Sequence, residues 1–91
     1  MPTISRFHGL SIVMHYAPRE HPPPHFHVHK GDVEAMVLIE TGAIHRGFLS
    51  TSDLAKIAKW CQTHRVVLLE NWRLAMSRSG PLNPIPPLPL P

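Results

Sequence analysis

The stretch that decides the fold runs from Pro24 to Gly31 and reads PHFHVHKG. Phe26 and Val28 alternate with histidines, and this alternation is typical of a β-strand, whose successive side chains point to opposite faces. The pattern predicts a strand that turns its phenylalanine and valine toward a core and three imidazoles outward, toward whatever the molecule touches. Gly31–Asp32 predicts the tight turn that ends this strand.

Strand signals continue on both sides of this stretch. Residues 3–7 alternate weakly and residues 10–16 clearly, with a break at His8–Gly9 that is typical of a hairpin turn. The apolar run within residues 33–40 predicts the central, best-covered strand, and residues 43–49 predict a further one. We therefore expect an antiparallel meander of four to five strands.

Helical periodicity follows the strands. Ser50 is expected to cap a helix, with Asp53 in the capping-box position, and Thr63 to cap a second helix after a break near residues 62–64. Leu69 is expected on the buried side of that second helix. The fold class is thus α+β, with two helices packed on one face of the sheet. The expected core consists mostly of Phe26, Val28, Val37, Ile39, Leu54, Ile57, Leu68 and Trp72.

The length of 91 residues suits a single domain, which we place at residues 1–80. Residues 81–91 form a proline-rich C-terminal tail, which should be extended and without internal hydrogen bonds. Its aliphatic side chains, Leu82, Ile85 and Leu88, predict a strap that lies on the body of the domain or on a neighbour.

Cys61 is the single cysteine, so no internal disulfide can form. No apolar stretch approaches the roughly 20 residues of a membrane span, and the N-terminus does not resemble a secretory signal. We expect a cytoplasmic protein. Cys61 falls on the apolar stripe of a predicted helix, which favours a core position over a reactive one.

Positive charge is concentrated in the helical half, where residues 54–91 carry five basic side chains against Glu70 alone. An acidic partner, either a protein or RNA or DNA, would be drawn to this half. Both tryptophans, Trp60 and Trp72, are expected to pack in the core. Of the two, Trp60 is expected nearer to a surface, because Lys56 lies four residues before it. The candidate partner-binding residues are Lys56, Lys59, Trp60, Arg65 and Arg73. Exposed strand edges and the tail also allow a homodimer.

Histidine is the outlier of the composition, with eight residues. His25 and His27 on one strand face could offer two ligands to a metal ion, with a third from His15, or from His45 or His21. The rest of a zinc site is not evident from spacing, so no cofactor is expected and a metal-binding module stays an alternative. The other interpretation is a polar face, partly covered by the proline loop, whose imidazoles bind backbone, water or a partner.

A further alternative needs no metal. His25 and His27 could serve as an acid–base pair that cleaves RNA, with Arg6 or Arg46 holding a phosphate. Whether the chain is an enzyme stays open at this point.

Several motifs occur in an order that resembles a small bacterial family, domain of unknown function 4160. They are the opening MPTISRF at residues 1–7, PPHFHV at 23–28, Thr41-Gly42, Gly47, Trp60, His64, Leu68, Trp72 and the IPPL ending at 85–88. The resemblance covers nearly the whole chain and implies no settled catalytic residue. One departure is Pro22, which makes a run of three prolines where the family more often shows two.

Members of this family are usually encoded beside another small domain of unknown function. Such pairs look like type II toxin–antitoxin modules, with this family in the toxin role. The resemblance therefore implies a toxin-like component that acts through a complex with a cognate small protein. The RNA-cleaving enzyme and the metal-binding module are the two alternatives.

Overall fold

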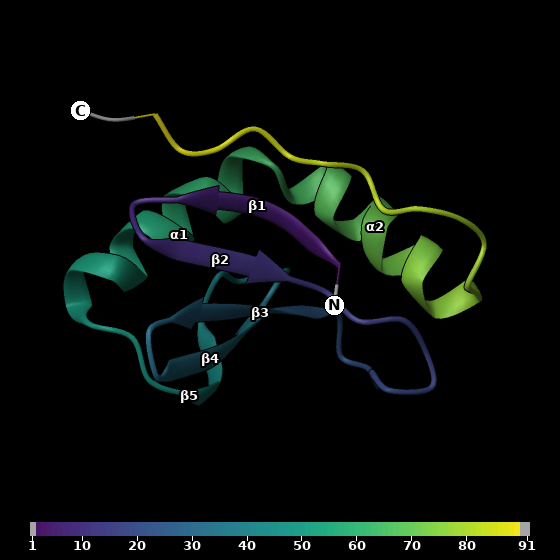
Figure 1. The fold of residues 1–91 in the computed structure, drawn as a ribbon, viewed down its shortest axis with the longest axis horizontal. Coiled ribbons are helices and arrows are strands. Elements are labelled where there is room, and N and C mark those ends of the chain that lie inside the picture. The colour runs from purple at the N-terminus through teal and green to yellow at the C-terminus, as the bar shows by residue number, and fades with distance from the viewer. Residues whose placement is uncertain (1, 90–91) are drawn as a thin grey trace.

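The computed structural model describes residues 2–89. Its elements are five strands, β1 (Thr3–Phe7), β2 (Leu10–Val13), β3 (His25–Lys30), β4 (Val33–Leu38) and β5 (Ile44–Gly47), and two helices, α1 (Thr51–Thr63) and α2 (Arg65–Ser77). The strands form one antiparallel sheet in the order β1-β2-β3-β4-β5 (Figure 1). The predicted α+β fold, a meander of strands followed by two helices, is confirmed.

The central strand is β3. Its first four residues are all buried, whereas β4 is buried only at alternate positions and its Val33 is 39% exposed. The prediction that residues 33–40 form the central strand is wrong, because a meander of five strands puts the third one in the middle. The second face of the apolar run, at Met36 and Leu38, is only half-buried.

The core lies between the sheet and the helices, and β3 contributes Phe26 and Val28 to it as predicted. Leu54 is an exception to the predicted core, since it is only half-buried. Trp60 is fully buried, 5.7 Å from the Phe26 ring between centroids, and its indole nitrogen donates to the Pro86 carbonyl at 2.9 Å. The expectation that both tryptophans pack in the core is confirmed, but their order is reversed, since Trp72 is 8% exposed and Trp60 is fully buried.

A side-chain cap marks the start of α1, whereas α2 begins without one. The Ser50 hydroxyl accepts a hydrogen bond from the Asp53 backbone N–H at 3.1 Å, as the predicted cap requires. Thr63 does not cap α2: its hydroxyl donates to the Lys59 carbonyl within α1, and His64 separates the two helices. Among the described residues, neither helix is long and apolar enough to cross a membrane.

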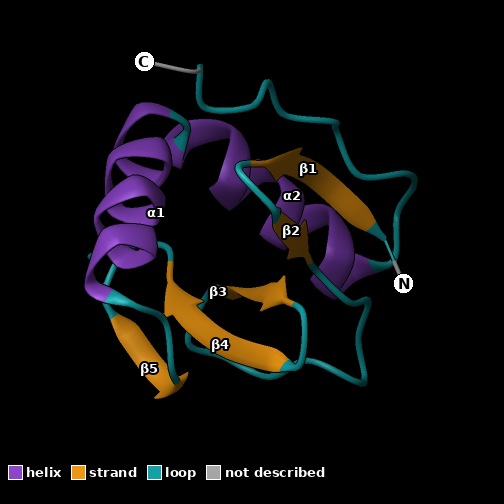
Figure 2. Cartoon of the chain, turned by 60° about the vertical axis from the view of Figure 1, so that its left-hand side comes forward, coloured by secondary structure: helices purple, strands orange, loops and turns teal. Residues whose placement is uncertain are grey.

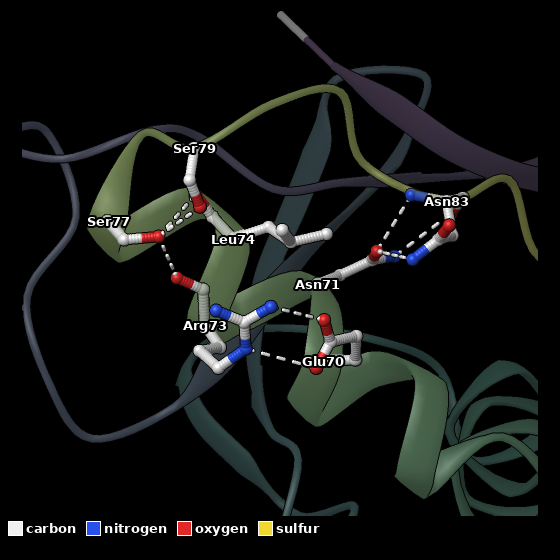
Figure 3. Close-up of polar contacts among 7 residues, drawn as sticks. All are labelled: Glu70, Asn71, Arg73, Leu74, Ser77, Ser79 and Asn83. Carbon is white, nitrogen blue, oxygen red and sulfur yellow. Dashed lines mark hydrogen bonds and ion pairs between the residues drawn. The ribbon is translucent and has the colours of Figure 1, made fainter.

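Residues 81–89 run back across the molecule beside β1 (Figures 1 and 2). The Ile85 N–H donates to the Ile4 carbonyl at 2.8 Å, and the Ile85 side chain is buried. The fully buried Asn71 of α2 accepts from the Asn83 N–H and donates to its carbonyl (Figure 3). Asn71 thus occupies the buried side of α2, while Leu69, predicted there, is 42% exposed.

Candidate functional site: a buried histidine–glutamate cluster

Strand parity places the histidines of β3 on the face turned away from Phe26 and Val28, as predicted. Cover by the proline loop was one of the interpretations of this face, but the cover is more complete than that interpretation expected: His25 is 3% exposed and His27 7%, and only His29 is partly open. The proline-rich segment 17–24 connects β2 to β3 and brings a buried acidic side chain against this face. The strand therefore does not offer its first two imidazoles to solvent or to a partner.

Glu20, in that segment, is the centre of the cluster and is 7% exposed. Its Oε2 atom lies 2.6 Å from His25 Nε2 and 2.8 Å from His27 Nε2. Sequence reasoning did not assign Glu20 to the site, because its separations of five and seven residues from these histidines match no metal-ligand motif. The sequence signal for Glu20 was its place in the loop that leads directly into His25, the first residue of the histidine-bearing strand β3.

His27 has a carboxylate at each ring nitrogen. Besides Nε2 on Glu20, its Nδ1 lies 3.2 Å from Oε2 of Glu34, a residue of the neighbouring strand β4. A carboxylate oxygen accepts hydrogen bonds, so the ring can donate to both neighbours only as an imidazolium. As a neutral ring, His27 would donate on one side and present a lone pair on the other.

A hydrogen bond to a backbone carbonyl orients the His25 ring. Its Nδ1 lies 2.7 Å from the Pro23 carbonyl oxygen, which can only accept, so Nδ1 carries a proton. In the neutral ring, Nε2 then turns a lone pair toward the Glu20 carboxylate. Nε2 is buried and makes no well-directed hydrogen bond, despite its short distance to Oε2. Two acceptors at this distance repel unless a cation, a proton or a metal ion, lies between or beside them.

His15 completes the cluster from the end of β2. Its ring centroid lies 5.0 Å from that of His27, and it is buried. Burial, reinforced by the nearby Arg19 guanidinium, lowers the pKa of His15 and favours its neutral form. One donor atom each from His15, Glu20 and His27 lie within 4.8 Å of one another. Of the predicted metal candidates, this group contains His15 and His27 and replaces His25 with Glu20.

The two arginines proposed for phosphate binding lie in different places. Arg46 of β5 lines a hollow of about 260 Å³ together with His25, and a second of about 210 Å³ together with His27 and Glu34. Arg6 of β1 pairs with Ser11 of β2, which in turn pairs with His29. The structure therefore brings Arg46 to the histidines and leaves Arg6 two strands away.

Three of the five predicted partner-binding residues meet at one groove. Lys56, Lys59 and Trp60 line a groove of about 510 Å³ between α1 and the tail, whose other walls include His64 and Leu88. Trp60 lies at its base but is buried.

Arg65 and Arg73 do not join this groove. Arg65 Nε donates to the Ile39 carbonyl at 2.9 Å, and Arg73 forms an exposed ion pair with Glu70 at 2.6 Å. Both guanidinium groups thus already have partners within the chain.

The model of the family Domain of unknown function (DUF4160) matches residues 9–73, more than two thirds of the chain. The chain belongs to this family. Comparisons with curated proteins and with solved structures gave no match. The matched part runs from before β2 into α2, which is narrower than the resemblance seen in the sequence.

All four cluster residues of this DUF4160 chain, His15, Glu20, His25 and His27, lie within the matched part. The groove is different, because its walls include His8 and Leu88, which lie outside it. Cys61 plays no part in either: its thiol donates to the Ile39 carbonyl, and burial raises its pKa. A buried thiol of this kind is a poor nucleophile, as its position on the apolar stripe indicates.

Proposed function

We propose that the protein is the toxin-like member of a type II toxin–antitoxin-like pair and acts through a complex with a cognate small protein. The family resemblance suggests such a pair. The observation that carries the proposal is the groove between α1 and the tail, because it supplies a surface of the right chemistry for a partner. Its volume of about 510 Å³ is enough to receive several side chains of a docked segment.

The groove combines an apolar lining with a basic rim. Ala55, Leu88 and Pro89 contribute accessible apolar surface, whereas Trp60 is buried behind it. Lys56 and the exposed Lys59 form the basic rim. Lys56 is partly neutralised, since its ammonium group lies 3.7 Å from the Asp53 carboxylate. Lys59 is exposed and has no ion pair among residues 2–89. An amphipathic helix with acidic residues beside its apolar face is the partner segment that matches this pattern.

The RNA-cleaving alternative receives less support from the geometry. An acid–base pair has to reach the scissile phosphate, but His25 and His27 are buried and both contact Glu20. Engagement of Arg65 and Arg73 within the chain also weakens the argument for a nucleic-acid partner.

Co-expression with the product of the neighbouring gene tests the proposal. The chain alone should arrest growth, and the neighbouring product should relieve the arrest and co-purify with it. Lys59→Glu should weaken the complex by about tenfold or more, because it sets like charges against each other at the rim. Arg6→Glu makes the same change of charge on an exposed residue of β1, outside the groove, and should leave affinity unchanged.

Two results would count against these assignments. If the chain does not affect growth and nothing co-purifies, the pairing itself is wrong. If a complex forms but Lys59→Glu and Arg6→Glu bind equally well, the partner docks elsewhere.

A further inference from the structure

The histidine–glutamate cluster contains polar groups whose mutual arrangement is unfavourable without a cation. Glu20 Oε2 is approached by His25 Nε2 at 2.6 Å and by His27 Nε2 at 2.8 Å, and all three residues are buried. Buried polar atoms in folded proteins are normally satisfied, yet His25 Nε2 makes no hydrogen bond. The cluster thus contains a ring nitrogen, His25 Nε2, whose lone pair is not used by any hydrogen bond of the described residues and can face a cation.

We propose that His15, Glu20 and His27 bind a divalent transition-metal ion, with Zn²⁺ the best match. Their three donor atoms lie within 4.8 Å of one another. Two imidazoles and one carboxylate form a ligand set that proteins use for zinc in sites with an open fourth position. No part of this assignment depends on partner binding, since the groove and the cluster share no residue.

The distances are close to those that such an ion requires. Ligand atoms about 2.0–2.2 Å from a tetrahedral zinc lie roughly 3.3–3.5 Å apart. Glu20 Oε2 and His27 Nε2, at 2.8 Å, would have to separate by about half an ångström. The most widely spaced donor atoms of the group, up to 4.8 Å apart, would have to approach by up to about 1.5 Å. Glu20 belongs to a loop and not to a strand, so its side chain can supply part of this adjustment.

The surroundings of His27 support the assignment independently. Metal-bound histidines usually donate their other ring N–H to a carboxylate or a carbonyl, which fixes the tautomer and orients the ring. His27 has this arrangement: Nε2 faces the cluster, and Nδ1 lies 3.2 Å from Glu34 Oε2. His25 shows the equivalent pattern, with Nδ1 on the Pro23 carbonyl and Nε2 free to face Glu20. As a neutral ring, His25 therefore has an Nε2 lone pair that can bind the ion as an additional ligand or accept a hydrogen bond from a water on it.

Two hollows at the surface of the sheet adjoin the cluster. The smaller one, of about 210 Å³, is lined by the proposed ligand His27 together with Glu34. The larger one, of about 260 Å³, is lined by the neighbouring His25.

Titration of the untagged, metal-stripped chain with Zn²⁺, followed by calorimetry and elemental analysis, tests the site. We expect one zinc per chain. His15→Ala and Glu20→Gln should each lower the affinity at least 100-fold, and Glu34→Gln, which only orients His27, about 10–100-fold. His8→Ala removes a histidine of the β1–β2 turn that lines the groove and not the cluster, and it is the matched control, with affinity unchanged.

The proposal is overturned if the wild-type chain binds no zinc, or if His15→Ala and Glu20→Gln retain wild-type affinity. Binding lost equally in His8→Ala would show adventitious capture by histidines outside the cluster, which also overturns it. If the cluster variants fail to fold, nitrogen NMR of the histidine rings in the wild-type chain decides. Zinc should shift the Nε2 resonance of His27 and a ring-nitrogen resonance of His15, and leave those of His8 in place; any other pattern refutes the assignment.

Discussion

Asp53 connects the cap of α1 to the end of β3. Its backbone N–H donates to the Ser50 hydroxyl at 3.1 Å, and its carboxylate accepts from the Lys30 ammonium group at 2.8 Å. The hydrogen bond from Lys30 lowers the pKa of Asp53 below its usual 3.8, and the Ser50 hydroxyl adds to this effect. A depressed pKa in the folded state means that the ionised carboxylate stabilises the fold.

The sign of the pH dependence follows from that shift. The stabilisation by Asp53 should be complete above 3.8 and should be lost as the pH falls through the lower pKa of the folded state. Asp53→Asn should therefore lower the free energy of unfolding at pH 7 by about 1–2 kcal/mol and flatten its decline in acid. Urea unfolding between pH 7 and pH 2 measures both effects.

Glu70→Gln is the control for Asp53→Asn, because it removes a carboxylate whose pair with Arg73 is exposed and contributes little. The same acid response in Asp53→Asn and the wild-type chain would show that the Lys30 contact does not carry the effect.

The sequence predicted to which face of the sheet each histidine of β3 points, since alternation is a local property of the strand. It did not predict that Glu20 would cover His25 and His27. That contact depends on how the segment 17–24 returns to the sheet, and residue spacing along an irregular loop carries no such information. The sequence therefore predicted the histidines of the site but not the carboxylate between them.

Among the elements, β5 depends on one glycine. Gly47 adopts φ +84°, where a Cβ would collide with the Glu34 carbonyl oxygen and lie 2.8 Å from the Ala35 Cα. Gly47→Ala should therefore cost about 3 kcal/mol or more, from backbone strain and from displacement of β5. Because β5 carries Arg46, the hollows beside the histidines should also change shape.

Gly31→Ala is the matched comparison. Gly31 also has a positive φ, +57°, but nothing lies within 4 Å of the position of its missing Cβ. Gly31→Ala should therefore lower the free energy of unfolding by the backbone strain alone, about 1–2 kcal/mol. Chemical denaturation of both variants separates the two contributions, and equal losses would contradict the close approach of β5 to β4.

The elements were predictable from sequence where their signals were local. The hairpin turn at His8–Gly9, the Ser50 cap and the break before α2 are each encoded by a few adjacent residues. The central place of β3 was not predictable from the apolar run of β4, because strand position depends on the number of strands and their order. The hydrogen bond from the Trp60 indole to the Pro86 carbonyl was likewise not predictable, because Pro86 lies far away in the sequence.

In the whole molecule, residues 81–89 of the tail lie against β1 and α2 and add the buried Ile85 to the core. Asn71 is the polar contact that holds it: fully buried, it exchanges two hydrogen bonds with the backbone of Asn83 and accepts a third from the Asn83 side chain. Two residues further on, the Ile85 N–H donates to the carbonyl of Ile4 in β1. Loss of the Asn71 side chain would leave buried backbone groups of the tail without partners.

Asn71→Ala should therefore lower the free energy of unfolding by about 2–3 kcal/mol, the cost of unsatisfied buried groups. Asn83→Ala keeps both backbone bonds to Asn71 and removes only the side-chain bond at 3.1 Å, so it should cost clearly less. Amide hydrogen exchange at Ile85 provides the local readout: protection should fall in Asn71→Ala and persist in Asn83→Ala. If Ile85 stays equally protected in both variants, the tail is held by the packing of Ile85 alone, and the role given to Asn71 is wrong.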